Sequence, residues 1–217
     1  MDDSSSKSNL DKIRPKHIAR RFSDHLRNLR VYLRVTRAKS ILRRYFVMNA
    51  FDGAMTSLGI VIGAYITHIT DPRAVIGIII VSGMAMAVSG FTGTYMTESA
   101  ERGRALNELE DAMLITLEDS VHGQASRIVP VVAAFVDGSA PFLASLPSIL
   151  PFALVIVGLI PVWIAFLTSI GSCLITLFIL GAFLGRISEE NIIYSGAKMI
   201  AAGVVVALLA LLLNGGL

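Results

Sequence analysis

Long apolar stretches that are almost free of charge are what most constrain the fold of this chain. No formally charged side chain occurs between Arg73 and Glu98, and only Asp137 occurs between Arg127 and Arg186. With 54% hydrophobic residues and a mean hydropathy of +0.68, the chain is too apolar for an ordinary soluble domain. The sequence therefore predicts an integral membrane protein.

Five segments are long enough to cross a bilayer core about 30 Å thick, which needs about 20 helical residues. The predicted fold is all-α and polytopic, with transmembrane helices at 45–69, 74–97, 128–157, 160–184 and 193–213. Asp71-Pro72-Arg73 predicts a tight turn after the first span, and Gly158 with Pro161 predicts a break after the third. Each proline in a helix removes a backbone donor, so we expect the third span to be kinked or broken. Its four prolines are Pro130, Pro141, Pro147 and Pro151.

The charge pattern divides the chain into four regions. We expect a basic cytoplasmic arm at 1–44, spans one and two at 45–97, a short acidic cytoplasmic helix within 98–127, and spans three to five at 128–217. Thirteen of the 19 Lys and Arg residues lie in the arm. Because cytoplasmic loops carry an excess of Lys and Arg, this bias predicts a cytoplasmic N-terminus and a C-terminus on the opposite side.

The basic arm has the pattern of an amphipathic helix. Apolar residues recur every three or four positions between Ile18 and Leu33, with arginines between them. Such a helix lies on the membrane surface with its arginines among phosphates, so anionic lipid headgroups, and not nucleic acid, are the predicted partner of the arm. A merely solvated basic tail is the alternative.

Two Asp-Gly pairs lie inside the apolar spans. Asp52-Gly53 is in the first span and Asp137-Gly138 is in the third, both about 10 to 14 Å from the cytoplasmic ends at 1.5 Å per residue. A carboxylate in hydrocarbon costs several kcal/mol, so these groups indicate an ion or proton path. A carboxylate with thioethers suits Fe(II) or Mn(II) better than Mg(II) or Ca(II), although methionine more commonly only packs. The predicted transport path consists of Asp52, Gly53, Met55, Met86 and Asp137.

The only acidic region lies between the second and third spans. At about 100° per residue its acidic side chains would share one face of a helix, where they could collect cations on the cytosolic side. A solvated acidic face, or pairing with the basic arm, is the alternative. The residues on this face are Glu101, Glu108, Asp111, Glu118, Asp119 and His122.

Several stretches in order resemble the vacuolar iron transporter family of iron and manganese transporters. The first is Phe51-Asp52-Gly53-Ala54-Met55-Thr56-Ser57-Leu58-Gly59-Ile60-Val61-Ile62-Gly63. It is followed by a small-residue second span ending in Glu98-Ser99-Ala100-Glu101, a proline-containing third span, Leu180-Gly181-Ala182-Phe183-Leu184-Gly185-Arg186, and Ser195-Gly196-Ala197-Lys198-Met199-Ile200.

The resemblance implies a homodimer of five-span subunits that exports Fe(II) or Mn(II) from the cytosol in exchange for protons, with no permanently bound cofactor. It places Asp52 in the ion and proton path and makes Glu98 and Glu101 gather metal. The full set of candidate metal ligands is Asp52, Glu98, Glu101, Glu108, Asp111, Glu118 and His122.

The sequence departs from the family at two places. Members commonly carry a glutamate in the second span where this chain has Ser89-Gly90, and their cytoplasmic metal-binding segment is longer than 102–127. One hypothesis is that Asp137 replaces the missing glutamate.

Two other functions stay open from the sequence. They are a permease for another cation or small solute on the same scaffold, and a non-transporting membrane scaffold. An enzyme is not expected, because the chain has no His-x-x-x-His pair, nucleophile elbow or phosphate-binding loop. We expect the membrane to be a prokaryotic cell membrane, with an organelle membrane as the alternative.

Overall fold

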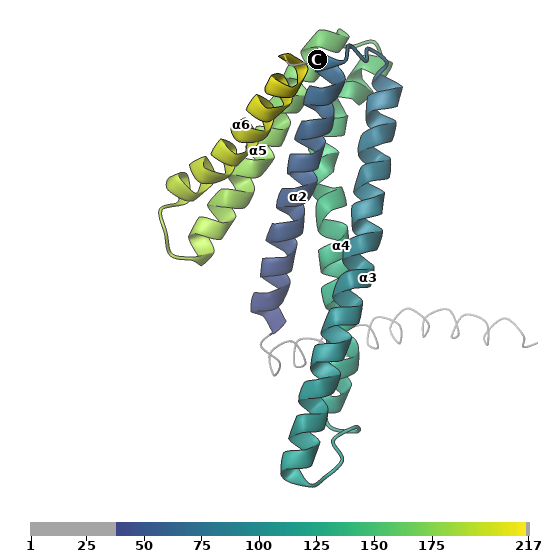
Figure 1. The fold of residues 1–217 in the computed structure, drawn as a ribbon, viewed down its shortest axis with the longest axis vertical. Coiled ribbons are helices and arrows are strands. Elements are labelled where there is room, and N and C mark those ends of the chain that lie inside the picture. Colours follow the sequence, from purple (N-terminus) through teal and green to yellow (C-terminus); the bar gives the residue numbers. More distant parts are fainter. Residues whose placement is uncertain (1–37, 216–217) are drawn as a thin grey trace, which may run out of the picture.

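The computed structural model describes residues 38–215, and within this part of the chain it is all-α (Figure 1). The helices are α2 (Ala38–Ile66), α3 (Pro72–Met113), α4 (Val121–Ile156), α5 (Val162–Ile187) and α6 (Ile192–Gly215). All five are long and apolar enough to cross a membrane, as the sequence predicts. The amphipathic helix predicted in the basic arm lies outside the described residues.

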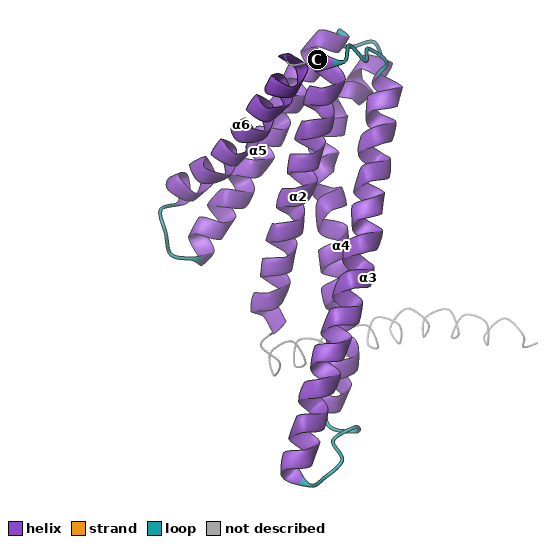
Figure 2. Cartoon of the chain, viewed as in Figure 1, coloured by secondary structure: helices purple, strands orange, loops and turns teal. Residues whose placement is uncertain are grey.

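Short loops join the helices, and local sequence explains where each loop falls (Figure 2). Asp71 caps α3 by accepting a hydrogen bond from the Arg73 amide at 3.0 Å, and Pro72 occupies the first helical turn, where no amide donor is needed. Gly158 takes a φ of +81° after α4, a conformation that costs glycine little. The chain therefore turns close to both predicted places, although Pro72 and Arg73 already belong to α3 and the first connection consists of residues 67–71.

The acidic segment is not a separate helix, which corrects the prediction from sequence. Residues 98–113 continue α3, which then ends where Leu114 adopts a left-handed conformation with φ of 54°. A new helix begins after Ser120, whose hydroxyl accepts a hydrogen bond from the Gly123 amide at 3.2 Å. The seven residues between α3 and α4 thus break the single acidic face, and Glu118 and Asp119 lie in the turn.

The third span is an unbroken helix despite its prolines. α4 runs from Val121 to Ile156 with all four prolines inside it, so the predicted break does not occur. Proline removes one hydrogen bond at each position, but packing of the helix against its neighbours can hold it together. Pro130, Pro141 and Pro151 are all buried within the subunit.

Close approach of backbones joins α2, α3 and α4, which lie side by side in Figure 1. A Cβ atom added to Gly53 would lie 2.3 Å from the Pro141 carbonyl oxygen, and one on Gly138 would lie 2.6 Å from the Ala87 carbonyl oxygen. Helices in lipid associate largely through such small-residue packing. Gly53 and Gly138 therefore set the spacing of the three helices around both aspartates.

The α5–α6 hairpin packs against α2 and α4 from the other side. Gly181 allows the Ser195 backbone to approach α5, since a Cβ there would lie 2.6 Å from the Ser195 carbonyl oxygen. Phe166 packs edge-on against Phe152 of α4, with ring centroids 5.1 Å apart, inside the buried core. This packing fixes α4 from the side opposite α3.

Candidate functional site

Asp52 lies at the middle of α2, and its side chain is exposed on the single subunit. It forms no hydrogen bond or ion pair with any residue in the described range 38–215. The next residue, Gly53, is buried against Pro141. The Asp-Gly pair therefore combines a close helix contact on one side of α2 with an exposed carboxyl group on another.

Asp137, by contrast, is buried, with only 3% of its surface exposed. Its two carboxylate oxygens accept hydrogen bonds from two other helices. Asn49 Nδ2 of α2 donates to Oδ1, and Thr94 Oγ1 of α3 donates to Oδ2 at 2.6 Å. Asp137 thus ties α2, α3 and α4 together through neutral donors.

The two aspartates lie at a similar level along the bundle. Asn49, which donates to Asp137, precedes Asp52 on α2 by less than one helical turn, or about 4.5 Å along the axis at 1.5 Å per residue. The Asp52 carboxyl group also interacts electrostatically with that of Asp137. The structure therefore places an exposed and a buried acid within range of each other.

The Asp137 carboxyl group occupies the space beside Gly90 of α3. A Cβ atom on Gly90 would lie 3.2 Å from Asp137 Oδ2. Gly90 is part of the Ser89-Gly90 pair that marks the departure from the family pattern. An acid from α4 therefore lies beside the α3 position that carries Gly90.

The two predicted path methionines lie on different sides of α2. Met86 of α3 reaches α2, where Thr56 Oγ1 donates a hydrogen bond to its sulfur at 3.7 Å. Met55 is half-buried and packs against the cluster that contains Leu58 and Cys173. The structure therefore brings Met86 to the α2–α3 side and leaves Met55 in the packing between α2 and α5.

Glu98 is 3% exposed and already has two partners. Tyr45 donates its hydroxyl to Oε1 at 3.0 Å, and Arg102 Nε donates to Oε2 at 2.8 Å in an ion pair. Both oxygens of this candidate metal ligand are therefore engaged by protein groups in this conformation.

The other candidate ligands are exposed and dispersed. Glu108 pairs with Arg104 at 2.8 Å, and Glu118 lies 3.7 Å from Arg127. Among residues 38–215, no group of three or more His, Cys, Asp or Glu side chains could hold a metal ion. The remaining exposed candidates are Glu101, Asp111 and His122.

Sequence reasoning missed three of the polar groups around the two buried acids. They are Tyr45, Asn49 and Thr94, which supply the donors to Glu98 and Asp137. Asn49 carried a usable signal, because an amide inside an apolar span needs a partner. Thr94 carried a weaker one, since threonine hydroxyls in helices commonly bond to their own backbone.

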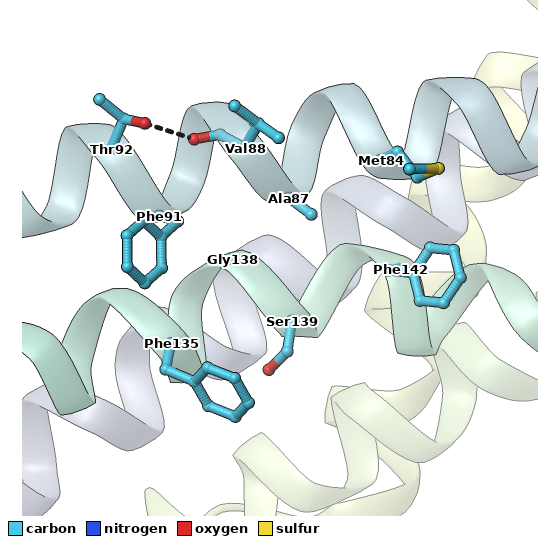
Figure 3. Close-up of a pocket in the computed structure, with 9 residues that line it drawn as sticks. All are labelled: Met84, Ala87, Val88, Phe91, Thr92, Phe135, Gly138, Ser139 and Phe142. Carbon is cyan, nitrogen blue, oxygen red and sulfur yellow. Dashed lines mark hydrogen bonds between the residues drawn. The ribbon is translucent and has the colours of Figure 1, made fainter.

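An apolar groove of about 510 Å³ lies between α3 and α4 on the outside of the subunit. Figure 3 shows Phe91 and Phe135 at one end of it, Met84 and Phe142 at the other, and Gly138 between them. It is lined by no titratable side chain, so it offers no charged ligand to a metal ion. The candidate site is therefore the polar region of Asp52, Asp137 and their neighbours.

Comparison with known proteins agrees with the resemblance seen in the sequence. The sequence model of the VIT family matches residues 103–214, from the last part of α3 to α6. The chain is also 31% identical over 174 residues to an uncharacterized protein of the archaeon Methanocaldococcus jannaschii, an alignment that covers 79% of this chain and 87% of that protein. No solved structure matches the chain.

Proposed function

Because the chain belongs to the VIT family, we propose that it is a transporter that moves Fe(II) or Mn(II) out of the cytosol in exchange for protons. The observation that carries the proposal is the exposed carboxyl group of Asp52 at the middle of an apolar helix, which has no hydrogen-bond or ion-pair partner among residues 38–215. An acid at that depth is costly unless it binds a cation or a proton during the working cycle.

The neighbours of Asp52 support a borderline divalent ion as the cargo. Thr56 lies one turn further along α2 and contacts the sulfur of Met86. Carboxylate, hydroxyl and thioether together suit Fe(II) or Mn(II) better than Ca(II) or Mg(II), which take oxygen ligands alone. Asp52 and Met86 are the residues that we assign to the metal at this level, with Gly53 as the packing residue that places Asp52.

We propose that two copies of the chain form a homodimer through the exposed face of α2. Met48, Asp52, Gly59 and Gly63 share this face at helical spacing, and Met48 is 58% exposed on the single subunit. A Cβ atom on Gly59 or Gly63 would meet nothing within 4 Å. A small-residue stripe of this kind is suited to a second helix, which would also shield Asp52 from lipid.

The exposed acids on the α3–α4 extension would collect metal on the cytosolic side. In this assignment Glu101, Glu108 and Asp111 attract cations by charge, with Glu118 and His122 near the turn. Glu98 joins them only when Arg102 releases it. The archaeal relative supports a prokaryotic cell membrane as the location.

Flux through purified protein in liposomes tests this proposal. We expect an imposed proton gradient to drive Mn(II) across the membrane, and a protonophore to stop it. Asp52→Ala should abolish the flux while the protein still inserts. Asp71→Asn is the matched control, because Asp71 lies outside the span and asparagine caps a helix as well as aspartate does.

Unchanged Mn(II) flux in Asp52→Ala would contradict the assignment of the site. Flux of Na⁺ or an organic solute without Mn(II) would instead favour a permease of another specificity.

A further inference from the structure

The environment of Asp137 differs from that of every other acid in residues 38–215, because it is buried at membrane depth and meets only neutral donors. Its partners are the Asn49 amide and the Thr94 hydroxyl. Glu98, the other buried acid in this range, has the guanidinium of Arg102 as a counter-charge. A buried carboxylate with no counter-charge lowers its free energy by binding a proton.

Few charged side chains on the helices packed against α4 lie near Asp137. On α2 the charged group within electrostatic range is Asp52, which repels a second negative charge. On α3 the acid nearest in sequence to Thr94 is Glu98, one turn away and already paired with Arg102. Within its apolar stretch 162–185, α5 presents no charged side chain. Among residues 38–215, only the two hydrogen bonds stabilise the ionised form of Asp137.

We propose that Asp137 carries the exchanged proton and releases it when a divalent metal binds at Asp52. This inference rests on the proposed function and assigns the coupling step to a residue. The two acids then have different roles, since exposed Asp52 binds the metal and buried Asp137 binds the proton.

The coupling follows from charge. A metal ion with two positive charges bound at Asp52 makes the net charge there positive. The site then attracts the negative form of Asp137 instead of repelling it. Asp137 then loses its proton to water, and its carboxylate keeps the hydrogen bonds from Asn49 and Thr94. One proton leaves for each metal bound, and the reverse exchange resets the site.

Polar groups also lie between this site and Arg102. Asn49 Nδ2 donates to the Tyr45 backbone carbonyl oxygen at 3.3 Å, one turn back along α2. The Tyr45 hydroxyl in turn bonds to Glu98, which lies one turn after Thr94 on α3. Because polar groups stand at these two levels, we assign the exit of the proton to this end of the bundle.

Proton release during metal binding tests the inference. The full-length protein in detergent, held in a weak buffer with a pH-sensitive dye, is titrated with MnCl₂ near neutral pH. We expect about one proton released per Mn(II) bound by the natural protein. Asp137→Asn should still bind Mn(II) but release at least fivefold fewer protons, and its affinity for Mn(II) should become nearly independent of pH.

Two further variants separate coupling from damage to the fold. Ser145→Ala is the matched control on the same helix, because Ser145 is buried and its hydroxyl bonds only within α4, to the Phe142 carbonyl oxygen. It should release protons as the natural protein does. Thr94→Val removes one donor to the carboxylate, so the pH dependence of Mn(II) binding should move to higher pH even if Asp137→Asn does not fold.

The outcomes distinguish the two proposals. If the natural protein fails to bind Mn(II), the proposed function fails and the inference fails with it. If it binds Mn(II) and Asp137→Asn releases as many protons as the natural protein, only the role of Asp137 is overturned. A Thr94→Val variant with an unmoved pH dependence would overturn it in the same way.

Discussion

The Oδ2 atom of Asp137 lies 3.2 Å from the point where a Cβ atom would stand on Gly90. The glycine on α3 thus leaves room for the acid on α4. A Cβ atom at position 90 would be in tight contact with the hydrogen-bonded Asp137, whose carboxyl group would have to shift by a few tenths of an ångström.

Gly90→Ala should therefore destabilise the protein. The added methyl group would crowd both Asp137 Oδ2 and the Gly138 Cα atom, which is 3.4 Å away. Overpacking of this kind costs about 1 to 3 kcal/mol. The measurement is thermal unfolding in detergent, with Gly93→Ala as control, since a Cβ there meets nothing within 4 Å. Equal unfolding temperatures for the two variants would contradict the contact.

Gly53→Ala should be more damaging than Gly90→Ala. Its Cβ would lie 2.3 Å from a backbone carbonyl oxygen, that of Pro141, which cannot move without shifting α4. We expect little or no folded protein by size-exclusion chromatography. Gly77→Ala, in open space on α3, should fold normally. A well-folded Gly53→Ala variant would mean that α2 and α4 are further apart than described.

Gly59→Leu should separate the proposed dimer without unfolding the subunit. A Cβ atom at this position meets nothing within 4 Å in the described part of one subunit, whereas a leucine side chain would block a second helix lying on the same face. Light scattering coupled to size-exclusion chromatography reports the mass of the particle. A dimer that persists in Gly59→Leu would move the interface away from this face of α2.

Arg102→Ala should destabilise the C-terminal part of α3. Removing the guanidinium leaves Glu98 buried without a counter-charge, and breaking a buried ion pair in this way costs about 3 to 5 kcal/mol. Arg104→Ala is the control, because its pair with Glu108 is largely exposed and such pairs contribute little. The measurement is thermal unfolding in detergent, where Arg102→Ala should unfold at a lower temperature than Arg104→Ala.

The Arg102→Ala, Glu98→Gln double variant adds a second measurement. A neutral amide at position 98 needs no counter-charge, so the double variant should recover part of the lost stability. No recovery would show that Arg102 acts through packing of its alkyl chain and not through its charge.

Much of the fold follows from the sequence, because the hydropathy of the long apolar runs is sufficient to predict membrane-spanning helices. The five spans and the turns at Asp71-Pro72 and Gly158 were predictable from hydropathy and turn chemistry. The position where α3 ends was not predictable in this way. The helical periodicity from Glu98 to His122 continues past Met113, whereas the chain turns at Leu114. Glu110 helps to close this turn by accepting a hydrogen bond from the Leu117 amide at 2.6 Å, a local contact with no strong sequence signature.

The candidate site was predictable only in part. Asp52 and Asp137 are recognisable because an acid in an apolar run is rare. The sequence does not show that one is exposed and the other buried, since burial depends on how α2 is oriented relative to α3 and α4. Asn49 and Thr94 become partners of one acid only when the three helices pack. Likewise, the contact between Thr56 and Met86 separates Met86 from Met55, although both were equal candidates in the sequence.

α3 is one helix of 42 residues, about 63 Å long at 1.5 Å per residue. This continuous helix joins the acidic tip to Gly90 and Thr94 without a break between them. A tilt of the tip, for example when cations neutralise its charges, would be transmitted along the helix to the part beside Asp137. The state of the exposed tip can thereby reach the centre of the bundle mechanically, with no chain of side-chain rearrangements in between.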